Sequence, residues 1–201
     1  MKSIVFIAVS IFITRQITWS QSIHDLARTG TVALMEEHLK KVPSDLNTIS
    51  EQGMTPFILA SYRGNNAVAK LLIDKGADIG YCSPEGTAIY GMIYKDNSAL
   101  LEYVLEKGYS PNDTCQFSQF GTPLNFAMSL RRYSIISLLM DSGAKTDNMN
   151  SQGQNLKDLL LFYKDEQLTK LFESHEKEIT TLHSTFIFSV VFFADLHHRR
   201  C

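Results

Sequence analysis

The 201-residue chain lacks the short motifs by which many enzymes can be recognised. It contains no dinucleotide-binding Gly-x-Gly-x-x-Gly, no P-loop, no His-Glu-x-x-His zinc motif and no Gly-x-Ser-x-Gly nucleophile turn. Its carboxylates are scattered along the chain and form no pair that points to acid–base chemistry. We therefore expect a protein that is not an enzyme and that needs no cofactor.

An excess of charge of one sign is also absent. The chain has 19 basic and 21 acidic residues, a formal net charge of −2, and no basic stripe. Binding to nucleic acid needs a concentrated positive surface, so no nucleic acid is expected as a partner. The 44% hydrophobic content nevertheless suffices for a folded core and argues against general disorder.

Cysteine is scarce, with Cys82, Cys115 and Cys201 the only three in the chain. No Cys-x-x-Cys pair is present and no spacing of cysteine and histidine suits zinc, so no metal site is expected. Because three is an odd number, at least one cysteine is expected to stay unpaired or to pair between chains.

The chain lacks an apolar run of about 20 residues, the length a helix needs to cross a bilayer. Its first run, Ile4–Ile13, follows a basic start and precedes the small residues Thr18 and Ser20. This layout predicts a signal peptide over residues 1–20, cut before Gln21, and a protein exported to the periplasm or outside the cell. The alternative is an uncleaved, membrane-associated N-terminal segment.

The second apolar run, Phe186–Phe193, lies in a C-terminal tail of residues 175–201. It is too short for a spanning helix, and its β-branched and aromatic residues favour a strand. The alternatives are that it packs on the preceding domain, contacts a membrane surface or pairs with another chain. A tail so unlike the rest could also come from an altered reading frame or a splice product.

What the chain does contain is an internal repeat. Segments beginning at Gly53, Glu85 and Phe120 align with one another. A threonine near the start and a glycine at the close recur, and both series step by 32 and then 35 residues. Because each unit keeps its length while the connections vary, the pattern predicts stacked repeats. The recurring residues are Thr55, Thr87 and Thr122, and Gly76, Gly108 and Gly143.

Each repeat is predicted to form two short helices. Thr55 caps the first helix, and Pro56 occupies its first turn, where the missing N–H costs nothing. Gly64 ends that helix and Gly76 ends the second. A single helix pair cannot bury its apolar side alone, but neighbouring pairs can bury it together.

These units resemble the ankyrin repeat, which has about 33 residues and a Thr-Pro-Leu-His-x-Ala core. Thr122, Pro123 and Leu124 keep the motif, whereas the middle unit has Ala88 in the proline place and Asp96 in the place of Gly64. The resemblance implies an all-α solenoid of stacked helix-turn-helix units with projecting β-hairpin or loop fingers. The first unit looks like a half-repeat and the last like a cap. The resemblance covers residues 21–174, with units at about 21–50, 51–82, 83–117, 118–149 and 150–174.

Two features differ among the units. Ile58 stands in the histidine place of the motif, and we expect His24 alone to keep that place, as a structural rather than a metal-binding or catalytic residue. Cys82 and Cys115 fall in successive connecting segments. A disulfide joins them if their Cα atoms come within about 7 Å, and does not form if the fingers stand farther apart.

The resemblance implies that a concave face, built from the fingers and the first helices, binds another protein. We expect Tyr62, Arg63, Tyr94 and Lys95 to form an aromatic and cationic patch on it, because Tyr and Arg often dominate interfaces. A monomer is expected. The candidate partner-binding residues are Glu51, Gln52, Met54, Tyr62, Arg63, Ser83, Glu85, Tyr94, Lys95, Phe117, Gln119, Phe120, Ser129 and Leu130.

Two other functions stay open at this point. One is a membrane-associated anchoring or structural protein, held by its two apolar ends. The other is a bacterial protective or immunity-type ankyrin protein, which the resemblance allows and no residue selects.

Overall fold

The computed structural model describes residues 21–113, 115, 121–150 and 152–177. The predicted signal peptide, the run Phe186–Phe193, and Phe117, Gln119 and Phe120 lie outside the described residues. The helices are α1 (Ile23–Thr29), α2 (Val32–Lys41), the 3-10 helix η1 (Pro43–Asn47), α3 (Pro56–Arg63), α4 (Asn66–Asp74), α5 (Ala88–Tyr94), α6 (Ser98–Glu106), α7 (Pro123–Ser129), α8 (Tyr133–Asp141) and α9 (Leu156–Tyr163), followed by helical residues 166–177.

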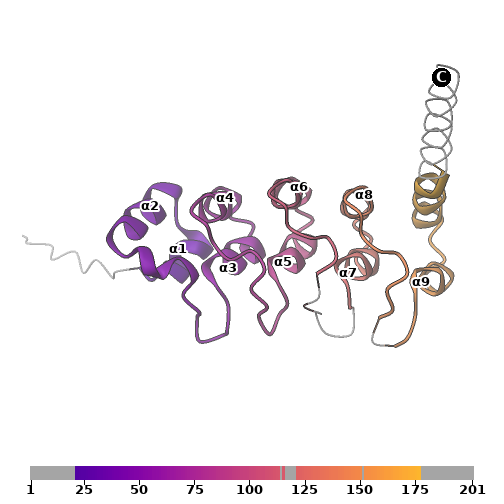
Figure 1. Cartoon of the computed structure of the whole chain (residues 1–201), viewed down its shortest axis with the longest axis horizontal. Helices are drawn as coiled ribbons and strands as arrows, with labels where there is room; N and C mark the ends of the chain where they lie inside the picture. The colour runs from indigo at the N-terminus through magenta and orange to yellow at the C-terminus, as the bar shows by residue number, and fades with distance from the viewer. Residues whose placement is uncertain (1–20, 114, 116–120, 151, 178–201) are drawn as a thin grey trace, which may run out of the picture.

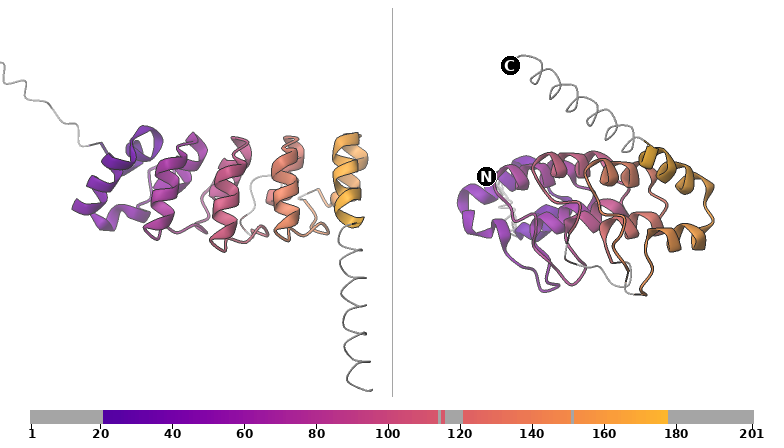
Figure 2. Two further views of the ribbon diagram at one scale, coloured as in Figure 1. Left: turned by 90° about the horizontal axis from the view of Figure 1, so that it is seen from above. Right: turned by 45° about the vertical axis from the view of Figure 1, so that its right-hand side comes forward.

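The helices form two rows, as Figure 1 shows. The first helix of each repeat (α1, α3, α5, α7 and α9) lies in the lower row, and α2, α4, α6 and α8 lie in the upper row. Seen from above in Figure 2, the helix pairs stand side by side in chain order. The loops that project below the lower row are called fingers, and their described residues are 48–54, 79–86, 110–113 with 115 and 121, and 146–150 with 152–154. This arrangement confirms the predicted helical solenoid.

Local side-chain chemistry starts the first helices where the repeat pattern predicts. The Oγ1 atoms of Thr55 and Thr122 each accept a backbone N–H, from Ile58 and Asn125, at 3.3 Å. A proline follows each of these threonines as the first helical residue. Thr87 differs because its hydroxyl donates to Asp113 instead of capping α5.

The first helices α3, α5, α7 and α9 end in the left-handed conformation whatever residue occupies the place. Gly64 has φ +73°, and Asp96, Arg131 and Lys164 in the corresponding places have φ of 56°, 53° and 49°. This conformation costs an L-residue roughly 1–2 kcal/mol, so the packing of the repeat overrides the local preference. The predicted glycine stop is therefore a property of the turn rather than of glycine alone.

The first unit is a complete helix pair, so the prediction of a half-repeat is wrong. Ser22 caps α1 by accepting the Asp25 N–H at 3.2 Å, and Thr31 caps α2 by accepting the Leu34 N–H at 3.3 Å. The unit lacks the Thr-Pro pair, but these two caps replace it.

The prediction that His24 keeps the histidine place is also wrong. The cap Ser22 puts Asp25, not His24, three residues into the unit, where Ile58 stands after Thr55. The Nε2 atom of His24 lies 2.8 Å from the carbonyl oxygen of Thr48. His24 therefore joins α1 to the first finger, which is a structural role.

One hydrophobic cluster runs between the two rows from Ile23 to Phe172. Phe57 and Tyr90 from the lower row and Leu72 and Leu101 from the upper row are fully buried in it. Burial of this continuous core stabilises each helix pair through its contacts with the neighbouring pairs. In the part of the chain that the structure describes, no helix is both long and apolar enough to cross a membrane.

Candidate functional site

The predicted aromatic and cationic patch divides into an exposed part and a half-buried part. Tyr94, at the end of α5, keeps 56% of its surface exposed. The Nζ of Lys95 lies 5.9 Å from the centre of the Tyr94 ring, and Arg63, at the end of α3, is exposed as well. These three side chains are available to a partner, and their types are common in protein interfaces.

Tyr62 belongs to the packing between repeats rather than to the free surface. Its hydroxyl donates to the carbonyl oxygen of Glu85 at 2.7 Å, which joins α3 to the second finger. Its ring lies so close to Gly91 that a Cβ atom there would be 2.8 Å from the Tyr62 Cδ2. Burial raises the pKa of the Tyr62 hydroxyl well above its usual value of 10.0. The exposed patch therefore consists of Arg63, Tyr94 and Lys95.

The first two fingers place their predicted residues differently. Glu51 and Gln52 are exposed at the first tip, and Met54 is half-buried. In the second finger, Glu85 is exposed, but Ser83 is buried and its hydroxyl donates to the Gly86 carbonyl at 2.6 Å. Ser83 thus closes its own turn and does not belong to the exposed surface.

The third unit contributes less surface than its sequence suggests. Ser129 is half-buried and its hydroxyl donates to the Phe126 carbonyl at 2.8 Å. Leu130 is half-buried and packs against the core cluster. Since Phe117, Gln119 and Phe120 lie outside the described residues, their part in binding stays a prediction.

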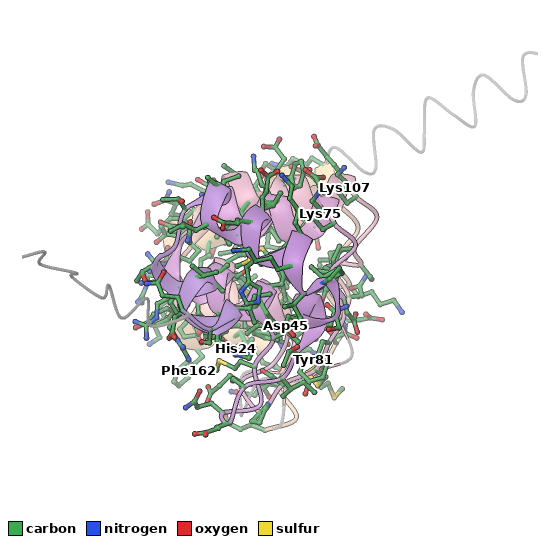
Figure 3. All side chains as sticks on the ribbon, turned by 90° about the vertical axis from the view of Figure 1, so that its left-hand side faces the viewer. His24, Asp45, Lys75, Tyr81, Lys107 and Phe162 are labelled. Carbon is green, nitrogen blue, oxygen red and sulfur yellow. A yellow bond between two sulfur atoms is a disulfide. The ribbon has the colours of Figure 1, made fainter. Side chains whose placement is uncertain are left out.

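The structure adds Phe162, an exposed aromatic residue that the sequence reasoning missed. Phe162 keeps 69% of its surface exposed near the end of α9. It follows the cap Asn155 by seven residues, as Tyr94 follows Thr87, so the repeat spacing could have identified it. In Figure 3 it lies at the outer edge of the molecule, away from Lys75 and Lys107 near the second helices.

A disulfide and a hydrogen-bond network hold the third finger. The Cα atoms of Cys82 and Cys115 are 5.6 Å apart and the bond is formed, as the spacing allowed. The Tyr109 hydroxyl lies 2.6 Å from Asp113 Oδ2 and 2.9 Å from Thr87 Oγ1. The other oxygen of Asp113 accepts the Cys115 N–H at 2.8 Å. Burial and the bond to Asp113 raise the pKa of Tyr109 far above its usual value of 10.0.

Ionisable side chains on the second helices pair with one another at the surface. The described ranges contain no cluster of three or more His, Cys, Asp and Glu side chains suited to a metal ion. On the second helices, the Tyr103 hydroxyl donates to Asp74 Oδ1 at 2.5 Å and Lys107 lies 3.3 Å from the same oxygen. The Tyr103 hydrogen bond, followed by Lys107, lowers the pKa of Asp74. These exposed contacts stabilise the surface of neighbouring repeats.

Comparison with known proteins places this geometry in a family. Residues 23–115 match the family model described as ankyrin repeats (3 copies). The human DNA-binding protein RFXANK is 41% identical over 59 residues, which are 29% of this chain and 23% of that protein. The putative ankyrin repeat protein FPV014 of fowlpox virus is 24% identical over 128 residues, 63% of this chain and 29% of that protein.

A further relative carries an additional domain in its name. Ankyrin repeat and SAM domain-containing protein 6 of mouse is 30% identical over 83 residues, 40% of this chain and 9% of that protein. This chain thus spans between 9% and 29% of the length of these three relatives. The match to the family model shows that residues 23–115 form ankyrin repeats, and the helix pairs that follow continue the same stack with its fingers.

Proposed function

We propose that this chain is a non-catalytic module that binds a partner protein through its fingers and the C-terminal ends of its first helices. The observation that carries the proposal is the exposed aromatic side chain in the same place of two repeats, Tyr94 and Phe162. Arg63 and Lys95 add cations along the same row of helix ends. Ankyrin repeats generally mediate contacts between proteins, and stacked repeats offer an extended surface for them.

The Tyr94 and Phe162 rings lie at the surface of the stack, where Lys95 approaches Tyr94 and Tyr163 packs edge-on against Phe162 with 5.5 Å between ring centres. Buried tyrosines such as Tyr90 and half-buried ones such as Tyr62 form hydrogen bonds that join repeats. Tyr94 and Phe162 instead leave 56% and 69% of their surfaces exposed. Exposed aromatic side chains can bury apolar surface against a partner at little cost in conformational entropy, which suits them to an interface.

Nucleic acid is not proposed as the partner, although one relative is named a DNA-binding protein. The chain has a net charge of −2, and Glu51 and Glu85 are exposed on the fingers beside the cationic residues. Phosphate backbones would be repelled by these carboxylates and would find no concentrated basic surface.

The test removes the exposed patch without touching the packing. A variant with Arg63→Ala, Tyr94→Ala and Lys95→Ala keeps Tyr62 and is compared with a control triple variant, Lys75→Ala, Glu102→Ala and Glu106→Ala, on the second helices. We expect at least a tenfold loss of partner capture from native extract for the first variant, which corresponds to roughly 1.4 kcal/mol. Equal capture by both variants, with unchanged circular dichroism, would refute the assignment of this face.

We also infer that the protein is exported after removal of residues 1–20. The disulfide between Cys82 and Cys115 supports this, because such bonds persist in oxidising compartments. N-terminal sequencing after cell fractionation tests it. A mature chain that starts at Gln21 in the exported fraction is expected, whereas a membrane-bound chain that starts at Met1 would favour the anchoring protein.

A further inference from the structure

In the three middle repeats, the residue three places after the first-helix cap is buried. This residue is Ile58 in α3, Tyr90 in α5 and Asn125 in α7. The Tyr90 hydroxyl lies 2.7 Å from the carbonyl oxygen of Gly121 and 2.9 Å from that of Cys115. Tyr90 is therefore long enough to bridge from its helix to the next finger.

Asn125 is too short to make the same bridge. Its side chain is 5% exposed, and its Nδ2 atom has no hydrogen-bond partner among the described residues. A buried amide N–H without an acceptor is unfavourable, so proteins rarely retain one without a reason. The missing partner marks Asn125 as a donor that is prepared for an acceptor from outside.

Space for such an acceptor lies beside Asn125. A cavity of about 200 Å³ lies between α7, α9 and the last finger. Its walls include Asn125, the finger residues Asn150, Gln152 and Gln154, and the rings of Phe162 and Tyr163. This volume is smaller than the 300–1,000 Å³ typical of drug-sized ligands, so it suits one side chain.

The chemistry of the walls selects a neutral polar group. The cavity is lined by side-chain amides, aromatic rings and Leu159, and none of these carries a charge at neutral pH. The Arg131 guanidinium lies 6.0 Å from the centre of the Tyr163 ring. The Arg131 Nε already pairs with Asp165 Oδ2 at 2.9 Å, however. A carboxylate would lose its hydration here without gaining a free cation. The Asn150 amide is already bonded within the finger, to Gln152 and Gln154. A carboxamide accepts from Asn125 and finds further polar atoms in the Gln152 amide and the Gln154 Nε2.

We infer that this cavity binds the carboxamide side chain of an asparagine or glutamine on the partner protein, with its carbonyl oxygen on Asn125 Nδ2. The inference rests on the proposed function, because Phe162 belongs both to the cavity wall and to the row of exposed aromatic residues. The cavity thus extends the proposed binding face to the last repeat.

The test uses the purified chain and small peptides, so it needs no partner protein. N-acetyl-glutamine N-methylamide is titrated at pH 7 while ¹⁵N NMR follows the side-chain amide signal of Asn125. The glutamate and leucine analogues serve as matched controls. We expect the glutamine peptide to shift the Asn125 signal with at least tenfold higher affinity than either control. No shift, or equal shifts from all three peptides, would overturn the inference.

Variants separate binding from a structural role of the amide. Asn125→Leu removes the unpaired donor at nearly constant size, so it should abolish glutamine-peptide binding without lowering the urea midpoint. Phe162→Ala, at an exposed position, should weaken peptide binding at least threefold and leave the fold intact. Retained peptide affinity in either variant, or a clear loss of stability in Asn125→Leu, would contradict the inference.

These results are distinguishable from those on the proposed face. If the peptide binds but the Arg63, Tyr94 and Lys95 variant captures partners normally, the cavity is supported and the proposed patch fails. If that variant loses its partner but no peptide binds, the cavity is refuted and the patch is supported.

Discussion

Gly91, in the middle of α5, sets how closely two neighbouring repeats approach. A Cβ atom at this position would lie 2.8 Å from Tyr62 Cδ2 and 3.0 Å from the Tyr62 backbone nitrogen. An alanine in a helix is normally favoured over glycine by about 1 kcal/mol. Here the clash outweighs that gain, and we expect Gly91→Ala to lower the free energy of unfolding by about 1–3 kcal/mol in urea titrations.

A double-mutant cycle identifies the cause of the Gly91→Ala effect. In a Tyr62→Ala background the ring is gone and only the backbone contact remains. The decrease in the free energy of unfolding caused by Gly91→Ala should therefore be at most half as large in this background. An undiminished loss would show that the Tyr62 ring does not set this spacing.

The sequence predicted the residues whose role is local and missed those whose role depends on another repeat. The cap of Thr55 and the stop at Gly64 follow from hydrogen bonds and dihedrals within a few residues. The burial of Tyr62 depends instead on Gly91 of the next repeat, and no spacing in the chain reports that contact. Ser83 is an exception, because the bond that accompanies its burial is local, to the Gly86 carbonyl three residues on.

At the scale of elements, the disulfide ties the second finger to the third. Cys82 and Cys115 are separated by 33 residues in sequence. Closing a loop of this length restricts the unfolded chain by roughly 3–4 kcal/mol in the chain-entropy model. We expect reduction to lower the free energy of unfolding by about this amount, measured by urea titration with and without a reductant.

Cys201 has to be removed from this comparison. A Cys201→Ser chain, used in both arms, excludes disulfides to the tail. In that background, Cys82→Ser should destabilise the oxidised protein as much as reduction does. Identical midpoints for oxidised and reduced protein would show that the bond does not restrain the unfolded chain.

Asp165 links the last two repeats in a pH-dependent way. Its Oδ1 caps the helical residues 166–177 by accepting the N–H groups of Gln167 and Leu168, and its Oδ2 meets Arg131 and Tyr133 at 2.9 Å. The hydrogen bond from the Leu168 backbone is the largest cause that lowers the pKa of Asp165 below its usual 3.8. The ionised form is thus favoured in the folded protein.

The sign of the effect follows from linkage. A lowered pKa stabilises the fold above the usual value of 3.8, and this stability is lost as the pH falls through the folded pKa. Asp165→Asn keeps the cap, because asparagine caps as well as aspartate, but it removes the charge. The stability difference between wild type and variant, measured in urea at pH 6 and at pH 3, should shrink at pH 3. A constant difference would contradict the role given to the carboxylate.

At the scale of the whole molecule, the repeat pattern predicted the architecture because it recurs three times with matched closing glycines. The first unit has no Thr-Pro pair, which left its second helix unpredicted, although the Ser22 and Thr31 caps build a full pair. The cavity beside Asn125 could not be predicted from the sequence, because α7, α9 and the last finger form it jointly.

The two sides of the stack differ in how they use their exposed side chains. On the second helices, Tyr103 donates to Asp74, and the Lys70 and Lys107 ammonium groups lie 4.8 and 5.1 Å from its ring. These polar and charged groups therefore interact with one another. Tyr94 and Phe162 on the first helices stay largely exposed. This asymmetry is why the binding face is assigned to the fingers and the first helices.

Site-specific photo-crosslinking tests that assignment most directly. A benzophenone side chain is placed either at Tyr94, on the first helices, or at Glu102, an exposed residue of α6 on the second helices. In native extract, the probe at Tyr94 should link to a partner, and excess wild-type chain should compete where the Arg63, Tyr94 and Lys95 variant does not. The probe at Glu102 should capture no such partner. Equal capture of one partner from both positions, or none from Tyr94, would contradict the proposed binding face.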